Sequence, residues 1–170
     1  MSDVKDLNGH EAISKMKELI DKIDICMFCT NIPDIPFNTR PMSTQEVDEE
    51  GNIWFLSSAS SNKNFEIRED EDVQLIYAAN SDAQFLTVYG KANVSYDKKK
   101  AAEIWNIEAK AWFKEGVDDP DLSVIRVKPE YAYYWTTKHG KIVSMIKILT
   151  AMVSNKTPDE GVEGVLEIKP

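Results

Sequence analysis

The feature that most constrains the fold is a pair of strand patterns that follow each other across a very short turn. The segments "DVQLIYAAN" and "AQFLTVYGKANVSY" flank the turn "NSD". Period-two spacing is present in both segments, at Val73, Leu75 and Tyr77 and at Phe85, Thr87 and Tyr89. Strands joined by so few residues can pair only in the antiparallel sense. Gly90, inside the second pattern, predicts a bulge or a sharp bend.

Further strand patterns surround this pair. A strand from about Arg40 to Val47, a "DEEGN" turn and a strand from Ile53 to Ser57 predict a second hairpin. "DICMFCT" predicts an earlier strand that runs into the loop "NIPDIPFNT", where two prolines prevent regular structure. A β-branched strand begins near Val124 and extends to Trp135, with Pro129 indicating an edge or a bulge within it.

Three segments show helical periodicity. Residues 9–23 predict an amphipathic helix, and Asn8 with Glu11 resembles a capping box at its start. Residues 97–113 predict a second helix with Asp97 as its N-cap, and residues 142–153 predict a last one. The expected class is α+β and mainly β: an antiparallel, barrel-like sheet with flanking helices. We expect one domain over residues 1–154, and residues 155–170 form either a linker and tail or a short terminal strand.

Composition excludes several classes of function. The net charge of −9 argues against nucleic acid and against an anionic membrane as partners, because both require clustered cations. The sequence has seven glycines and neither of the glycine-rich phosphate-binding motifs, so a bound phosphate would have to be held by side chains. The first residues contain no apolar core of the kind found in signal peptides, and a cytoplasmic location is expected.

Two cysteines form a C-x-x-C motif on the first predicted strand. A redox motif of this type needs its first sulfur at the start of a helix, and here a helix precedes the pair. Residues three apart on a strand point to opposite faces, so Cys26 and Cys29 are not expected to meet. Zinc would need two more ligands, and the sequence has only two histidines. We therefore predict two buried, unreactive cysteines and no metal site.

A polar corner, "SSASSNK", follows the apolar strand that ends at Ser57 and precedes a short helical pattern. One interpretation is local: serines cap helices, asparagines fill turns, and Lys63 points into water. However, a lysine in the first turn of a helix meets the positive end of the helix dipole, which is unfavourable by about 0.3–1 kcal/mol. A bound anion would reverse this effect. Both interpretations remain open on the chemistry of the residues alone.

Five motifs occur in order along the chain: "RPMS", "GNIWFLSSASSNK", "VQLIYA", "FLTVYGKANV" and "IWNIEAKAWFKEGVDDPDLSVIRVKPEYAYYW". Together they resemble the general stress protein 26 group of the pyridoxamine 5′-phosphate oxidase-like, FMN-binding split-barrel superfamily. The resemblance covers roughly residues 10–150, and its most specific part is the block from Trp112 to Trp135. It implies an antiparallel split β-barrel and a homodimer with FMN in clefts at the subunit interface.

The resemblance also implies a set of cofactor-binding residues. Arg40, Pro41, Met42 and Ser43 correspond to the strand that lies against the isoalloxazine ring, with Arg40 on the pyrimidine side. Ser57 corresponds to a hydroxyl that contacts the ribityl phosphate, and Ser61 to an additional phosphate donor. Asn62 and Lys63 stand where the oxidases carry an arginine–lysine pair on the phosphate, so Asn62 gives up one charge. FAD or another flavin would use similar chemistry.

The aromatic residues allow two interpretations. Trp105 and Trp112 lie on the apolar stripe of the predicted helix 97–113, which favours packing in the core for both. Trp112 is alternatively a residue that closes over the flavin of a partner subunit. Tyr131, Tyr133 and Trp135 alternate along one face of a strand, which suits a dimer interface as well as a core.

The predicted function is therefore that of a stress-related FMN-binding flavoprotein that transfers hydride or electrons to an unidentified acceptor. The alternative is a protein that binds or stores flavin without catalysis. A true pyridoxamine phosphate oxidase is disfavoured, because the C-terminal arginine–x–histidine of those enzymes has no counterpart beyond Lys141. With only two histidines, a serine–histidine–aspartate hydrolase is also disfavoured.

Overall fold

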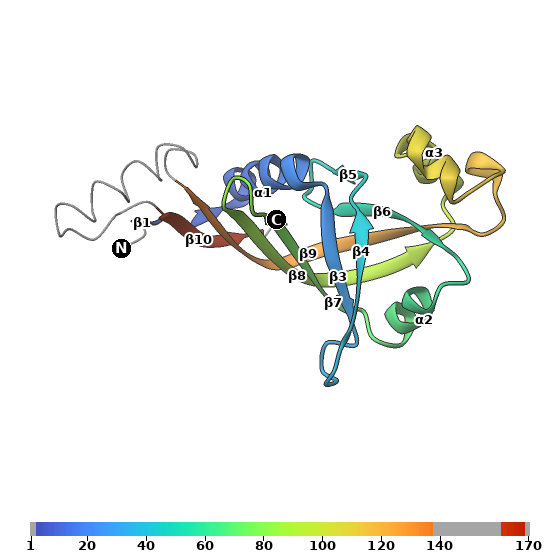
Figure 1. Ribbon diagram of the computed structural model, residues 1–170, viewed down its shortest axis with the longest axis horizontal. Coiled ribbons are helices and arrows are strands. Elements are labelled where there is room, and N and C mark those ends of the chain that lie inside the picture. Colours follow the sequence, from blue (N-terminus) through green and yellow to red (C-terminus); the bar gives the residue numbers. More distant parts are fainter. Residues whose placement is uncertain (1–2, 138–160, 169–170) are drawn as a thin grey trace.

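The computed structural model describes residues 3–137 and 161–168 (Figure 1). The helices are α1 (Gly9–Ile23), α2 (Asn62–Glu69) and α3 (Lys98–Glu103), with the 3-10 turns η1 (Ile107–Ala111) and η2 (Gly116–Asp118). The strands are β1 (Asp3–Val4), β2 (Leu7–Asn8), β3 (Ile25–Thr30), β4 (Asn38–Ser43), β5 (Glu46–Val47), β6 (Ile53–Ser58), β7 (Asp72–Ala79), β8 (Gln84–Ser95), β9 (Leu122–Thr137) and β10 (Gly161–Glu167). The predicted helix 142–153 lies outside the described residues.

The described strands form one sheet with the order β1-β10-β9-β8-β7-β3-β4. Off this path, β6 pairs with both β5 and β9, and β2 pairs with β10. The pairs are antiparallel except for β1 and β2, which run parallel to β10. The predicted α+β class with a mainly antiparallel sheet is therefore confirmed. The pairings among the described strands do not close into a ring, so the barrel is not shown.

The hairpin predicted around the "NSD" turn is present as β7 and β8, from Asp72 paired with Lys91 to Ala79 paired with Gln84. The predicted irregularity at Gly90 is also present, as a register shift between β8 and β9 at Tyr89 and Gly90. A Cβ on Gly90 would lie 2.3 Å from the carbonyl oxygen of Lys128, so only glycine allows the two strands to approach this closely.

The strand predicted from Arg40 to Val47 is two strands with different partners. β4 pairs with β3, whereas β5 pairs with β6 in the predicted hairpin. The chain changes partner at two consecutive residues: the amide of Thr44 donates to Asp24 O at 2.7 Å, and that of Gln45 to Trp54 O at 2.9 Å. Short-range periodicity cannot detect this change, because both strands keep an extended backbone.

The helix predicted over residues 97–113 is wrong as a continuous element. Asp97 caps α3 as predicted, through its carboxylate and the amide of Lys100. The chain then leaves the helix, and the Asn106 side chain accepts a hydrogen bond from the amide of Ala109 at 2.8 Å, which starts η1. Trp112 is consequently 83% exposed, so the expectation that it packs in the core is also wrong. Trp105 packs against Phe113, with ring centroids 6.3 Å apart.

The main core lies between α1 and the inner face of the sheet. α1 buries one stripe, formed by Ala12, Met16, Leu19 and Ile20. It spans the predicted residues 9–23, although the Asn8 side chain makes no capping hydrogen bond. A second, smaller cluster lies under α3 and η1 and comprises Ala101, Ile104, Ala109, Phe113, Leu122 and Val124. This cluster holds the segment of residues 98–113 against β9 and thereby forms one wall of the cavity described below.

Candidate functional site

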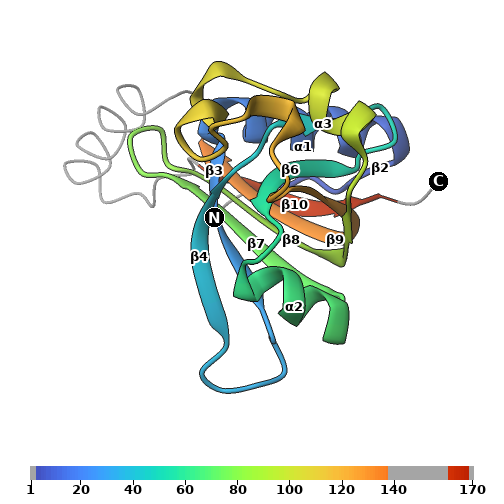
Figure 2. The same ribbon diagram turned by 90° about the vertical axis from the view of Figure 1, so that its right-hand side faces the viewer.

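A cavity of about 570 Å³ lies between β4, β6, the start of α2 and the η1 segment. Seven of the nine residues predicted to bind a cofactor line it: Arg40, Pro41, Met42, Ser43, Ser57, Lys63 and Trp112. Ser61 and Asn62 adjoin Lys63 in sequence but do not line the cavity. In Figure 2, α2 lies below and α3 above, and β4 runs between these levels along one side. Three segments that are distant in sequence thus meet around one space.

Lys63 lies in the first turn of α2 and is half-buried. Its ammonium group donates to the hydroxyl of Ser61, the N-cap residue, at 3.0 Å. Burial lowers the pKa of Lys63, and the nearby charge of Arg40 lowers it further, whereas Asp121 and Glu66 act in the opposite direction. No acidic residue occupies the first turn of α2. This end of the cavity therefore holds a desolvated cation at a helix start, which favours an anion.

Arg40 lies at the same end of the cavity. Its guanidinium group donates to the Thr30 hydroxyl at 2.5 Å and forms an ion pair with Glu66 of α2 at 2.9 Å. The resemblance implies that this arginine faces the pyrimidine side of a flavin ring. The structure places its charge beside α2, close enough to Lys63 to lower the pKa of that lysine. Arg40 and Lys63 thus form one cationic end.

Glu66 is a residue of this end that the sequence analysis missed. Its carboxylate accepts hydrogen bonds from Thr30, Asn38 and Arg40 at 2.5, 2.8 and 2.9 Å. Burial opposes its ionisation, but the bond from Thr30 and the charge of Arg40 outweigh burial and lower the pKa of Glu66. The spacing of three residues from Lys63 on a helix places both on one face and is the signal that could have found it.

A buried relay of hydrogen bonds supports Ser57. The Ser57 hydroxyl donates to the Asn64 side-chain oxygen at 2.8 Å, and the Asn64 amide donates to the Ser123 hydroxyl at 2.9 Å. Ser123 returns a hydrogen bond to the Ser57 carbonyl at 2.8 Å, and all three residues are buried. Sequence reasoning missed Asn64 and Ser123, although an asparagine on the inner face of a short helix is an indication of such a contact.

Asp121, in the turn that directly precedes β9, shapes the polar corner. Its carboxylate accepts from the Ser58 hydroxyl at 2.5 Å and from the Ser60 amide at 2.9 Å. Its carbonyl accepts from the Ala59 amide at 2.6 Å. The bond from Ser58 and then that from the Ser60 amide lower the pKa of Asp121. The "DPDL" part of the most specific motif therefore fixes the loop that leads to Lys63.

The other end of the cavity is formed by the η1 segment and the β4–β5 connection. Ile25, Pro41, Met42, Leu56 and Phe113 provide apolar lining there, and the polar lining comprises Ser43, Gln45, Asn106 and Glu108. The Asn106 amide donates to the Gln45 side-chain oxygen at 2.7 Å, which joins the two walls. This arrangement is an apolar slot with a few polar groups at its edge, as small-molecule sites commonly are.

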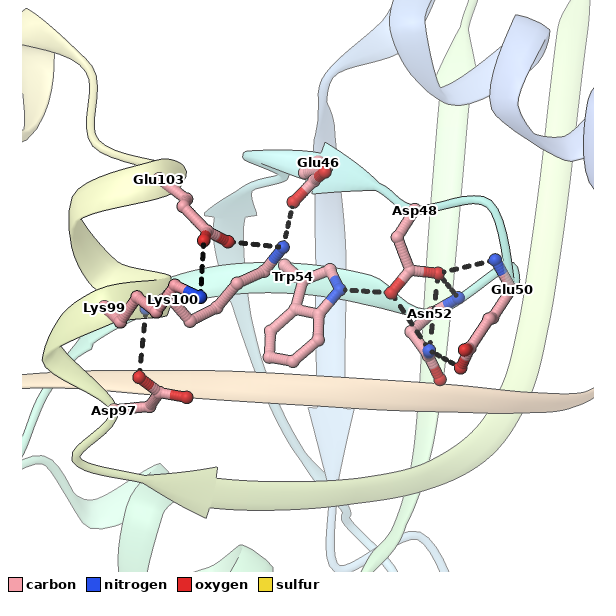
Figure 3. A network of polar contacts seen from close by, with 9 residues as sticks. All are labelled: Glu46, Asp48, Glu50, Asn52, Trp54, Asp97, Lys99, Lys100 and Glu103. Carbon is pink, nitrogen blue, oxygen red and sulfur yellow. Dashed lines mark hydrogen bonds and ion pairs between the residues drawn. The ribbon is translucent and has the colours of Figure 1, made fainter.

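A polar network joins α3, which precedes η1 in the chain, to the β5–β6 hairpin (Figure 3). Lys100 of α3 lies 4.5 Å from the ring centroid of Trp54 on β6 and forms ion pairs with Glu46 of β5 and, at 3.8 Å, with Glu103. The Trp54 indole donates to the Asp48 carboxylate at 2.8 Å in the β5–β6 turn. The wall that carries Asn106 and Trp112 is thus fixed to the same hairpin that carries Leu56 and Ser57.

Other chemistry finds little support in the described part of the chain. Cys26 and Cys29 are buried and unpaired with each other, as predicted, and burial raises the pKa of Cys26 to about 12. Within residues 3–137 and 161–168, no group of three or more histidine, cysteine or acidic side chains is placed to hold a metal ion. None of the helices in these residues has the length and apolar character that crossing a bilayer requires.

Solved structures of similar fold come from several bacteria. A protein from Jannaschia sp. CCS1 described as a general stress protein 26 has a TM-score of 0.74 at 20% identity and covers 94% of this chain and 99% of its own. The general stress FMN/FAD binding protein of Xanthomonas citri has a TM-score of 0.64 at 21% identity and covers 74% of this chain and 89% of its own. These similarities show the fold.

Sequence comparison identifies the family. The protein bli-3 of Neurospora crassa is 22% identical over 112 residues, which are 61% of this chain and 54% of that protein, so the match spans about half of the relative. The family described as pyridoxamine 5′-phosphate oxidase like matches residues 11–159, most of the chain. The chain belongs to the pyridoxamine 5′-phosphate oxidase-like family.

Proposed function

We propose that this protein binds FMN in the cavity between β4, β6, α2 and η1 and uses it for hydride or electron transfer. The observation that carries the proposal is that seven residues implied by the family resemblance line one cavity, with Lys63 and Arg40 at one end. The family membership and the flavin-binding description of the Xanthomonas citri relative support it. FAD remains the alternative flavin.

The residues present fit the phosphate of such a cofactor. Lys63 supplies an ammonium group and Arg40 adds a second charge at the same end, whereas the hydroxyl protons of Ser57 and Ser58 are donated to Asn64 and Asp121. Glu66 and Asp121 carry two negative charges nearby, which formally balance the charges of Arg40 and Lys63. An incoming phosphate would restore to Lys63 the favourable interactions that burial removes.

The remaining cavity fits an aromatic ring system. Its volume of about 570 Å³ lies within the range of roughly 300–1,000 Å³ that is usual for small-molecule sites. Met42, Leu56 and Phe113 would exclude water, and the β4 backbone at Pro41 would orient the ring edge. The flavin itself would supply the redox chemistry.

We further propose that the protein is a homodimer with the cavity at the subunit interface, built on a split barrel. The outer face of the sheet exposes apolar side chains that adjoin across the strands: Met27 opposite Ile76, and Phe85 opposite Trp135. Tyr131 and Ile25 extend this face, and Ile25 also lines the cavity. A second copy that covers the face would also cover the cavity.

One measurement distinguishes a catalytic flavoprotein from a flavin-storage protein. If the protein is an oxidoreductase, the flavin absorbance of the loaded protein bleaches with NADH or NADPH under anaerobic conditions and returns when an acceptor is added. A storage protein keeps its absorbance over the same period.

The phosphate assignment is tested with Lys63→Ala. Loss of a charged hydrogen-bond donor should weaken FMN binding by about 1.5–3 kcal/mol, while the affinity for riboflavin, which lacks the phosphate, stays unchanged. Lys17→Ala on the exposed face of α1 is the matched control. Equal FMN affinities for Lys63→Ala and wild type, in calorimetric titrations, would remove Lys63 from the site.

A further inference from the structure

The end of the cavity opposite Lys63 contains a pair of side-chain amides whose orientation is fixed. Asn106 Oδ1 accepts from the Ala109 amide at 2.8 Å, so its Nδ2 must face Gln45. Gln45 Oε1 therefore accepts from Asn106, and Gln45 Nε2 donates to the Ser43 carbonyl at 3.0 Å. The backbone of η1 thus orients the Asn106 amide, and Asn106 in turn orients the Gln45 amide.

These contacts leave part of the hydrogen-bonding capacity of both amides unused. A primary amide carries two N–H donors and an oxygen with two lone pairs. Gln45 and Asn106 each use one N–H and one lone pair in the contacts above. Each retains one donor and one acceptor site, and both residues line the cavity. The pair therefore matches a planar edge that carries alternating carbonyl and N–H groups.

The charge at this end differs from that at the Lys63 end. Arg40 pairs with Glu66 beside α2, and no lysine or arginine other than Arg40 and Lys63 lines the cavity in the described part of the chain. The only charged side chain of η1 that lines it is the carboxylate of Glu108. A ring edge at this end meets neutral donors and a nearby negative charge.

From this arrangement we infer that Gln45 and Asn106 are the residues that recognise the pyrimidine edge of the flavin, and that they do so without a cation. The inference rests on the proposed function. Its consequence is that the protein disfavours negative charge on the reduced ring, which keeps the reduction potential of the bound flavin low.

The test uses two single-residue variants of the full-length protein. Asn106→Asp keeps the oxygen that caps η1 but replaces the donor with a second oxygen, and Gln45→Ala removes the other amide. Both should weaken binding of FMN and of riboflavin by the same factor, about tenfold. Competition by inorganic phosphate against FMN should keep its wild-type inhibition constant. Thermal unfolding of each cofactor-free variant shows that the fold is retained.

The midpoint potential of the bound flavin gives a second test. Variants that change the charge at Gln45 or Asn106 should shift this potential, and they would not do so if the two residues had only a structural role. Gln45→Lys should raise the midpoint potential of the bound flavin, and Asn106→Asp should lower it, as measured by equilibration with reference dyes. Lys110→Gln, on the exposed side of η1, is the control and should leave the potential unchanged.

The outcomes separate the inference from the proposed function. If wild-type protein binds neither FMN nor riboflavin, the proposed function fails. If it binds both, and the Gln45 and Asn106 variants keep wild-type affinities and potentials, this inference alone is overturned. A loss confined to FMN would assign the amides to the phosphate and would also contradict it.

Discussion

At the scale of single residues, the hydrogen-bond relay through Ser57, Asn64 and Ser123 can be tested by measuring protein stability. Replacement of Asn64 by alanine removes the acceptor of the buried Ser57 hydroxyl and the donor to the buried Ser123 hydroxyl, while Ser123 keeps its bond to the Ser57 carbonyl. We expect a loss of about 2 kcal/mol in the free energy of unfolding, measured by urea denaturation. Asn62→Ala, at an exposed position two residues earlier, should stay within about 0.5 kcal/mol of wild type. A similar small effect for Asn64→Ala would contradict the relay.

The lowered pKa of Lys63 predicts a pH dependence of binding. Burial and the charge of Arg40 stabilise the neutral amine, so the lysine loses its proton at a lower pH than the ordinary value of 10.5. Only the charged form holds a phosphate. FMN affinity should therefore decline as pH rises through this lowered pKa and be retained below it.

Lys63→Arg separates this effect from other titrations, because arginine stays charged throughout the range. Titrations at intervals between pH 7 and 11 should show an earlier decline for wild type than for Lys63→Arg. Parallel curves for the two proteins would show that the titration of Lys63 does not control binding.

The residues predicted from sequence and those missed differ in the range of their contacts. Lys63 and Ser57 lie in one local corner, so their motif could be recognised along the chain. Glu66, Ser123 and Asp121 act through partners on other elements, such as Thr30 and Ser58. No local pattern contains those pairings. The position of Arg40 was missed for the same reason, because its ion pair depends on how α2 packs on β3 and β4.

At the scale of elements, the β8–β9 irregularity at Gly90 makes a sharp prediction. Gly90→Ala would place a Cβ 2.3 Å from the Lys128 carbonyl oxygen, against backbone that has little freedom to move. We expect a loss of at least about 3 kcal/mol in unfolding free energy. Gly116→Ala is the control: its φ of 68° is unfavourable for alanine, but the space is open, so about 1 kcal/mol is expected. Equal losses would contradict the steric account.

Periodicity predicted most elements but not the ends and breaks that tertiary contacts decide. α1 and the β7–β8 hairpin follow their patterns because each buries a regular face. The apolar pattern extends over residues 97–113, but the helix α3 ends at Glu103. The break is set by Asn106, whose side chain caps the next turn and binds Gln45 on another element. The two short N-terminal strands were missed because they are defined only by pairing with β10.

At the scale of the whole molecule, the short turns between strands were sufficient to predict an antiparallel α+β fold. They were insufficient to predict whether the sheet closes into a barrel or whether two chains form a dimer, because both depend on contacts outside the turns. The exposed face formed by Met27, Ile76, Phe85, Tyr131 and Trp135 is where assembly can be tested.

Trp135→Glu should convert the proposed dimer to a monomer, because a carboxylate would be buried in an apolar interface. Sedimentation equilibrium gives the mass, and FMN affinity should fall in parallel because the cavity would lose its cover. Ile35→Glu, in the loop between β3 and β4 where the side chain is 96% exposed, should leave both quantities unchanged. A wild-type monomer that binds FMN fully would contradict the interface site.

The central claim is that one cavity per chain accepts a flavin nucleotide with its phosphate at Lys63. Titration of cofactor-free wild-type protein with FMN, followed by quenching of flavin fluorescence, tests it most directly. We expect saturation at one FMN per chain and a higher unfolding temperature for the saturated protein. Fluorescence that rises linearly with added FMN, together with an unchanged unfolding temperature, would contradict it.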